Sequence, residues 1–253
     1  MGVVPAVISR FYLSRCLIEL GELREAAATI EEALGIADTL DDPWGRVVSC
    51  IGMAEVEIHR GDATRALSTS ARALDLCAAH VPFLFAIAAS THGWALARSH
   101  RVAEAVALME RAVESATAMR IAHEGSLLRV RLGEGYLAGG RLGDARDTAL
   151  AALEFAREHE QYGQAAWVCL LLGEIAQADP SLVADGADQY RRALALAEPR
   201  EMRLVAAHCH AGLAKVYRRT GKQREAQERL NTATTMYREM EMTYWLGRVE
   251  EES

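Results

Sequence analysis

Small residues recur along this chain at intervals of 39 to 41 residues, and they do so in three aligned columns. The first column reads Ser14, Ala54, Gly93, Gly133, Gly173 and Ala214. The other two lie further along each repeat, seven residues apart, and read Ala26, Ala66, Ala105, Ala145, Gly186 and Ala226, then Ala33, Ala73, Ala112, Ala152, Ala193 and Ala233. A periodic exclusion of bulk lets two helix backbones approach closely in every repeat. The columns therefore predict tandem pairs of helices.

A turn position lies between the first column and the second. It reads Gly21, Gly61, His100, Gly140, Pro180 and Gly221. Glycine suits this place because a tight turn after a helix requires a positive φ. We therefore expect a single solenoid over residues 1–253, with helix hairpins at residues 3–40, 43–80, 82–119, 121–159, 161–198 and 200–238. The joint at residues 177–185 is irregular, since it carries a proline and one extra residue.

The two ends of the chain differ in how they can shield an apolar face. At residues 242–252 we expect a capping helix, because Met242, Trp245, Leu246 and Val249 share one helical face that can cover the last hairpin. At the other end no comparable cap is found. We expect the apolar residues there to be exposed unless a further segment or a partner covers them: Val3, Val4, Ala6, Val7 and Ile8.

Two motifs, Leu132-Gly133-x-x-Tyr136 and Leu213-Ala214-x-x-Tyr217, resemble the first helix of a tetratricopeptide repeat. HEAT repeats share the period of about 40 residues, but these motifs and the paired small columns favour the tetratricopeptide type. The resemblance implies an all-α, right-handed superhelical solenoid of about six hairpins. It also implies that the first helix of each pair lines a concave groove.

Composition and charge exclude several classes of function. The net charge of −7 argues against a general nucleic-acid binder and against binding to anionic membranes. We expect the basic cluster Lys215, Arg218, Arg219, Lys222, Arg224 and Arg229 to be a solvated helix face, because Glu225 and Glu228 lie within it. The five cysteines are Cys16, Cys50, Cys77, Cys169 and Cys209. They have no Cys-x-x-Cys spacing, which predicts buried free thiols in a reducing cytoplasm.

No pattern in the sequence indicates catalysis. It holds neither a nucleophile elbow nor a His-Glu-x-x-His zinc motif nor a glycine-rich dinucleotide turn. His208-Cys209-His210 looks like a metal-ligand cluster, but residues two apart on a helix point to different faces. We therefore expect no catalytic residue, no metal site and no cofactor.

The candidate binding residues follow from the expected groove. The residue after the first small column points into it, and this position reads Arg15, Glu55, Trp94, Glu134, Glu174 and Lys215. Neighbouring groove positions add His59, Arg98, Arg131 and Trp167. A tryptophan flanked by arginine and glutamate is typical of a recognition site. The alternative for Trp94 and Trp167 is that they pack between adjacent repeats, and the sequence leaves both interpretations open.

Two C-terminal segments, 207–222 and 232–246, carry a more specific resemblance. They are similar to the repeat tail of large bacterial signalling proteins that join an adenylate/guanylate cyclase domain, an AAA-type ATPase domain and tetratricopeptide repeats. LuxR-type and maltose-activator-type regulators have a similar spacing. The resemblance implies a cytoplasmic, non-catalytic module that binds a protein partner, or its own missing catalytic or ATPase domains, and leaves homo-oligomerisation open. The alternative is a sensor that binds a small metabolite in the groove.

Overall fold

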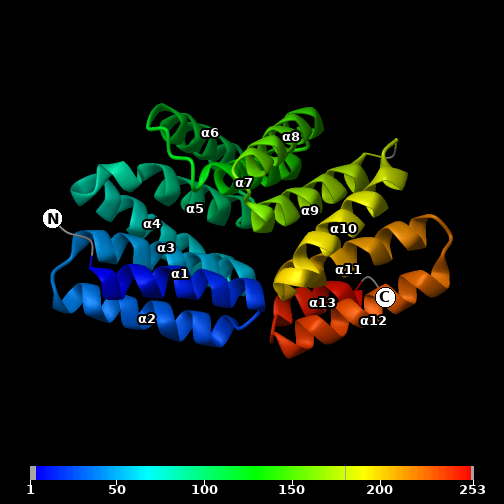
Figure 1. Cartoon of the computed structure of the whole chain (residues 1–253), viewed down its shortest axis with the longest axis horizontal. Coiled ribbons are helices and arrows are strands. Elements are labelled where there is room, and N and C mark those ends of the chain that lie inside the picture. Colours follow the sequence, from blue (N-terminus) through cyan, green and yellow to red (C-terminus); the bar gives the residue numbers. More distant parts are fainter. Residues whose placement is uncertain (1–3, 180, 252–253) are drawn as a thin grey trace. The chain divides into compact units, whose positions relative to one another are not determined.

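The computed structural model describes residues 4–179 and 181–251, and within them it contains helices and no strand (Figure 1). The α-helices are α1 (Pro5–Leu20), α2 (Leu23–Thr39), α3 (Pro43–Arg60), α4 (Ala63–His80), α5 (Phe85–Arg98), α6 (Val102–Ala118), α7 (Gly125–Ala138), α8 (Leu142–Glu158), α9 (Tyr162–Ala178), α10 (Val183–Ala197), α11 (Arg203–Arg219), α12 (Gln223–Glu239) and α13 (Thr243–Glu251). Two short 3-10 helices are η1 (Pro82–Leu84) and η2 (Glu198–Arg200). The predicted all-α fold of helix hairpins is confirmed.

The helices pack in chain order and form two compact units. Each odd-numbered helix from α3 to α11 packs against the helix that follows it, and α1 meets α2 where the Ser14 hydroxyl donates to the carbonyl oxygen of Ala26 at 3.0 Å. The first unit ends at Glu124 and the second begins at Gly125; the segment Glu19–Gly21 is grouped with the second. We describe each unit by itself, and the single uninterrupted solenoid stays a prediction.

The turns inside the hairpins use the left-handed backbone conformation that glycine favours. Gly21, Gly61, Gly140 and Gly221 have φ between 70° and 83°. His100 takes the same conformation without being glycine, with φ of 61°, and Pro180 lies outside the described residues. A second set of positive φ values, between 49° and 55°, occurs in the turns between hairpins, at Asp41, Arg120, Glu160, Glu201 and Glu241. Nothing in the sequence predicts this second set, since none of its members is glycine.

The columns of small residues lie at the helix crossings. A Cβ atom added to Gly93 would lie 3.1 Å from the carbonyl oxygen of Ala105, and one added to Gly133 would lie 3.6 Å from that of Ala145. The alanines of the third column are all fully buried: Ala33, Ala73, Ala112, Ala152, Ala193 and Ala233. The closest atoms to those added Cβ atoms are side chains, Met109 at 2.5 Å for Gly93 and Leu171 at 2.7 Å for Gly133, so bulk is excluded mainly by packed side chains.

Two sequence predictions about burial need correction. Val7 is fully buried in the core of the first unit, beside Phe11 and Ile30, rather than exposed. Val4, Ala6 and Ile8 are half-buried, and Val3 lies outside the described residues. Among the cysteines, Cys16 is exposed, because it faces away from α2, while the other four are buried free thiols.

The last helix, α13, covers apolar surface of the preceding hairpin. Met242 is fully buried and Val249 is 5% exposed, and the Trp245 ring lies 4.6 Å from the ring of His208 on α11. Position 252 of the predicted capping helix lies outside the described residues. Among the helices in residues 4–179 and 181–251, none is both long and apolar enough to cross a membrane.

Candidate interaction surface

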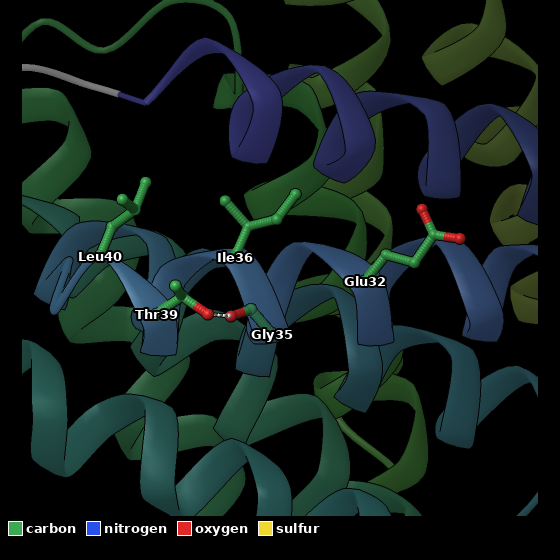
Figure 2. A pocket seen from close by; sticks show the side chains of 5 residues that line it. All are labelled: Glu32, Gly35, Ile36, Thr39 and Leu40. Carbon is green, nitrogen blue, oxygen red and sulfur yellow. Dashed lines mark hydrogen bonds between the residues drawn. The ribbon is translucent and has the colours of Figure 1, made fainter.

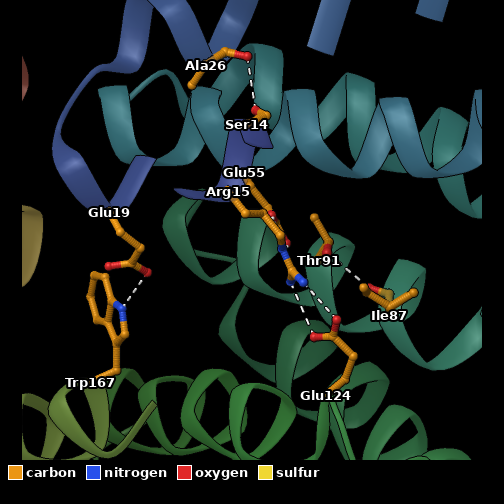
Figure 3. A network of polar contacts seen from close by, with 9 residues as sticks. All are labelled: Ser14, Arg15, Glu19, Ala26, Glu55, Ile87, Thr91, Glu124 and Trp167. Carbon is orange, nitrogen blue, oxygen red and sulfur yellow. Dashed lines mark hydrogen bonds and ion pairs between the residues drawn. The ribbon is translucent and has the colours of Figure 1, made fainter. Parts of the chain in front are cut away.

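In the first unit, equivalent positions of successive first helices meet directly. Arg15 on α1 and Glu55 on α3 are 40 residues apart, and both follow a small-column residue. The Arg15 Nε donates to Glu55 Oε2 at 3.0 Å and its Nη2 donates to Glu55 Oε1 at 3.1 Å (Figure 3). Two residues of the predicted groove column are therefore in contact within the first unit.

Glu124 completes this ionic network, and sequence reasoning missed it. Arg15 Nη1 donates to Glu124 Oε1 at 2.7 Å, and Arg15 Nη2 donates to Glu124 Oε2 at 3.3 Å. The side chains of Glu55 and Glu124 are only 3% and 8% exposed, and that of Arg15 is 20% exposed. Burial opposes the charged guanidinium, but the two carboxylates raise the pKa of Arg15 well above its usual range. One arginine thus binds two buried carboxylates in bidentate fashion.

His59, Trp94 and Arg98 form a second group in the first unit. The His59 ring meets the Trp94 ring edge-on, with centroids 5.1 Å apart, and the Arg98 guanidinium lies 5.9 Å from the centre of the Trp94 ring. Trp94 itself is only 5% exposed and packs in a core cluster with Ile58 and Ala66. This burial favours the packing interpretation of Trp94. The solvent-facing members of the group are Arg98, which is exposed, and His59, which is half-buried.

The remaining predicted residues lie in the second unit, at different depths. Arg131 on α7 is 3% exposed, Glu134 on the same helix is half-buried and Glu174 on α9 is exposed. Trp167 on α9 is half-buried, and its ring centroid lies 6.2 Å from that of His208 on α11. The expected groove positions are thus not equally open to a partner.

His208 is the centre of an aromatic group that the groove column did not predict. Its Nδ1 lies 2.7 Å from the hydroxyl of Tyr237 on α12, and its ring also meets those of Trp167 and Trp245. The signal in the sequence was the pairing of Trp167 and His208, which occupy equivalent positions of α9 and α11. His210, two residues on, points elsewhere: its Nδ1 lies 3.2 Å from Arg229 Nη1, and burial together with that cation lowers its pKa to about 4.

Two arrangements that resemble chemical sites fail on geometry. In the part of the chain that the structure describes, no three His, Cys, Asp or Glu side chains are placed to hold a metal ion. Ser70 Oγ lies 2.9 Å from His92 Nδ1, as in a nucleophile–base pair, but Ser70 is fully buried. Its hydroxyl also donates to the carbonyl oxygen of Ala66 on the same helix at 2.6 Å. The Ser70–His92 contact joins α4 to α5 in the core.

Comparison with known proteins shows the fold. No family model matches this sequence, and no curated protein matches it. Among known structures, a Rap protein in complex with Competence and Sporulation Factor has a TM-score of 0.70 and 12% identity, over 100% of this chain and 76% of that one. The Rap conjugation gene regulator of the plasmid pLS20, in complex with the Phr* peptide, has a TM-score of 0.68 and 17% identity, over 81% of this chain and 57% of that one. BtubC from P. vanneervenii has a TM-score of 0.61 and 18% identity, over 87% of this chain and 92% of that one.

Proposed function

We propose that this chain is a non-catalytic interaction module that binds a segment of a protein partner on the faces of its first helices. The observation that carries this proposal is the contact between Arg15 and Glu55, because it joins equivalent positions of neighbouring hairpins. First helices arranged in this way present a row of side chains that an extended segment can follow.

We propose that the more exposed of the predicted residues contact the partner. In the first unit these are Arg98 and His59, which lie against the buried Trp94. In the second unit, taken by itself, they are Glu134, Trp167 and Glu174, while Arg131 is a buried support. Aromatic and arginine side chains of this kind are frequent energetic anchors of interfaces.

The similar structures support a peptide as the bound segment. The pLS20 regulator is described with the Phr* peptide bound, and that protein shares the hairpin fold of this chain. Sequence identity of 17% shows fold alone, so the ligand class is part of our proposal. We further propose a cytoplasmic setting and a bacterial signalling role, with cyclase or ATPase domains as intramolecular partners, on the strength of the sequence resemblance.

The test begins with selection of binding peptides from a random 12-residue display library on the immobilised full chain. Affinities of the selected peptides are then measured by fluorescence anisotropy. For the first unit, Arg98→Glu is compared with Arg72→Glu, an exposed position on α4 with the same change in charge. For the second unit, Glu174→Arg is compared with Glu154→Arg, an exposed position on α8.

We expect the first-helix variants to weaken binding about tenfold or more, and the matched second-helix variants to change it less than twofold. Equal effects within each pair would contradict the proposal. Calorimetry against a metabolite panel addresses the sensor alternative. The sensor alternative would be favoured if a metabolite binds to the wild type with measurable heat and if Arg98→Glu or Glu174→Arg abolishes that heat.

A further inference from the structure

An open apolar groove lies on the side of α2 that faces α1, where Glu32 pairs with Arg10 (Figure 2). It has a volume of about 610 Å³ and is lined by Glu32, Gly35, Ile36, Thr39 and Leu40. In Figure 2 the side chains of Glu32, Ile36 and Leu40 project from the same side of the helix. Leu40 is 57% exposed and Ile36 is half-buried, so the floor of the groove is apolar and accessible.

Gly35 opens the groove. A Cβ atom added there would meet nothing within 4 Å. The equivalent positions of the next three hairpins carry the acidic side chains Asp75, Glu114 and Glu154. Glycine in the interior of a helix weakens it relative to alanine. The first hairpin therefore has an unoccupied space where its neighbours have a side chain.

Two other hairpins place an arginine over an aromatic ring in the corresponding region. The Arg111 guanidinium lies 5.4 Å from the Phe85 ring centre, and that of Arg200 lies 4.8 Å from the Tyr162 ring centre. In the first hairpin the position of Arg111 is occupied by Glu32, and the position of Arg200 by Leu40. The first hairpin thus offers a carboxylate and an exposed leucine where others supply their own cation.

The charge of the first hairpin specifies the chemistry of an occupant. Residues 1–42 hold eight carboxylates and three arginines, a net charge of −5 out of −7 for the chain. Glu25 is exposed and lies on the same helical stripe as Glu32. Glu32 is 66% exposed and receives one hydrogen bond, at 3.1 Å, from Arg10 Nε. A cationic partner would be attracted by the negative electrostatic potential at the end of the groove that carries Glu25 and Glu32.

We propose that this groove on α2 is a docking surface for a cationic amphipathic helix of a protein partner. An apolar side chain of that helix enters the groove beside Ile36 and Leu40, over Gly35. Lysine or arginine side chains one turn away pair with Glu25 and Glu32. This surface does not depend on the proposed role of the first-helix faces.

The test uses a fluorescein-labelled 15-residue peptide of leucine and lysine, with its leucines on one helical face. A leucine–glutamate peptide of the same pattern is the charge control. Binding to the full chain is followed by anisotropy for the wild type and for Gly35→Glu and Leu40→Ala, with Leu150→Ala as the control. Leu150 is 47% exposed on α8 and lies on the other unit.

We expect Gly35→Glu to weaken binding at least tenfold, although it adds a negative charge, because its side chain fills the groove. Its melting temperature should be unchanged or higher, since glycine leaves a helix interior. Leu40→Ala should weaken binding several-fold, Leu150→Ala should leave it unchanged, and the leucine–glutamate peptide should not bind.

Three results would overturn the proposal. If Gly35→Glu binds as tightly as the wild type or more tightly, the attraction depends on net charge alone. If Leu150→Ala reduces binding as much as Leu40→Ala, the groove is not the site. If sedimentation velocity shows wild-type self-association that Gly35→Glu abolishes, the groove binds a second copy of this chain.

Discussion

Replacing Arg15 by methionine should destabilise the first unit strongly. Methionine keeps an unbranched apolar stem in place of the arginine side chain, whose guanidinium lies 5.0 Å from the Phe11 ring centre. The change therefore removes the charge and the hydrogen bonds with little loss of packing. It leaves Glu55 and Glu124, with side chains 3% and 8% exposed, without the cation that bridges them.

The size of the effect follows from the geometry of the network. Four N–H to oxygen contacts between 2.7 and 3.3 Å are lost. Removing one partner of a buried ion pair typically costs about 3–5 kcal/mol, and the partial exposure of Arg15 places it at about 3 kcal/mol. For a unit of this size, that corresponds to a melting temperature lower by about 10 °C.

Urea denaturation followed by circular dichroism measures this loss, and a second substitution tests its cause. The double variant Arg15→Met/Glu124→Gln has one buried carboxylate charge fewer, so it should regain about 1–2 kcal/mol of unfolding free energy relative to Arg15→Met.

Two results would refute this reasoning. One is an Arg15→Met variant within about 0.5 kcal/mol of the wild type, the range of an ordinary surface substitution. The other is a double variant less stable than the single one, since it would mean that Glu124 stabilises the fold independently of Arg15.

Three further predictions follow from packing, backbone conformation and titration. Ala145→Leu should cost about 1–3 kcal/mol, because α8 crosses α7 closely there, while Glu154→Leu on the exposed side should cost little; thermal melting compares them. His100→Gly should be neutral or stabilising by up to about 1 kcal/mol and His100→Val destabilising by about 1–2 kcal/mol in urea titrations, because the φ there is 61°. Burial and Arg229 lower the pKa of His210 to about 4, so stability should be lost as the pH falls from about 6.5 to about 4. His210→Gln should remove about 2–3 kcal/mol of that pH dependence.

The hairpin fold could be predicted because its cause is local and periodic. A close helix crossing needs a small residue at one place in each repeat, and six copies of one requirement are visible in a single sequence. Glycine turns are visible for the same reason. The left-handed turns at Arg120 and Glu160 were not, because these residues adopt positive φ only where the packed helices on both sides impose it.

The candidate surface could be predicted less well because it depends on helix phase and depth. The groove column contains both Arg15 and Glu55, which are in contact, but it predicted neither that contact nor how deeply each side chain lies. Trp94 occupies the same column as Arg15, yet it is packed among Ile58 and Ala66. A rotation of about one residue in helix phase moves a side chain between groove and core, and sequence alone does not fix it.

Separation along the chain distinguishes contacts that a repeat can predict from those it cannot. Arg15–Glu55 and Ser126–Gln161 join residues 40 and 35 apart in neighbouring hairpins, and Arg203–Glu239 joins the two helices of one hairpin. Arg15–Glu124 joins residues 109 apart, beyond the next two hairpins. In a repeat array with nearest-neighbour contacts alone, unfolding can proceed hairpin by hairpin. A buried ion pair between the first helix and the end of the same unit links the unfolding of one hairpin to the unfolding of the other hairpins in that unit. Breaking it should therefore broaden the urea transition of the first unit as well as shift its midpoint.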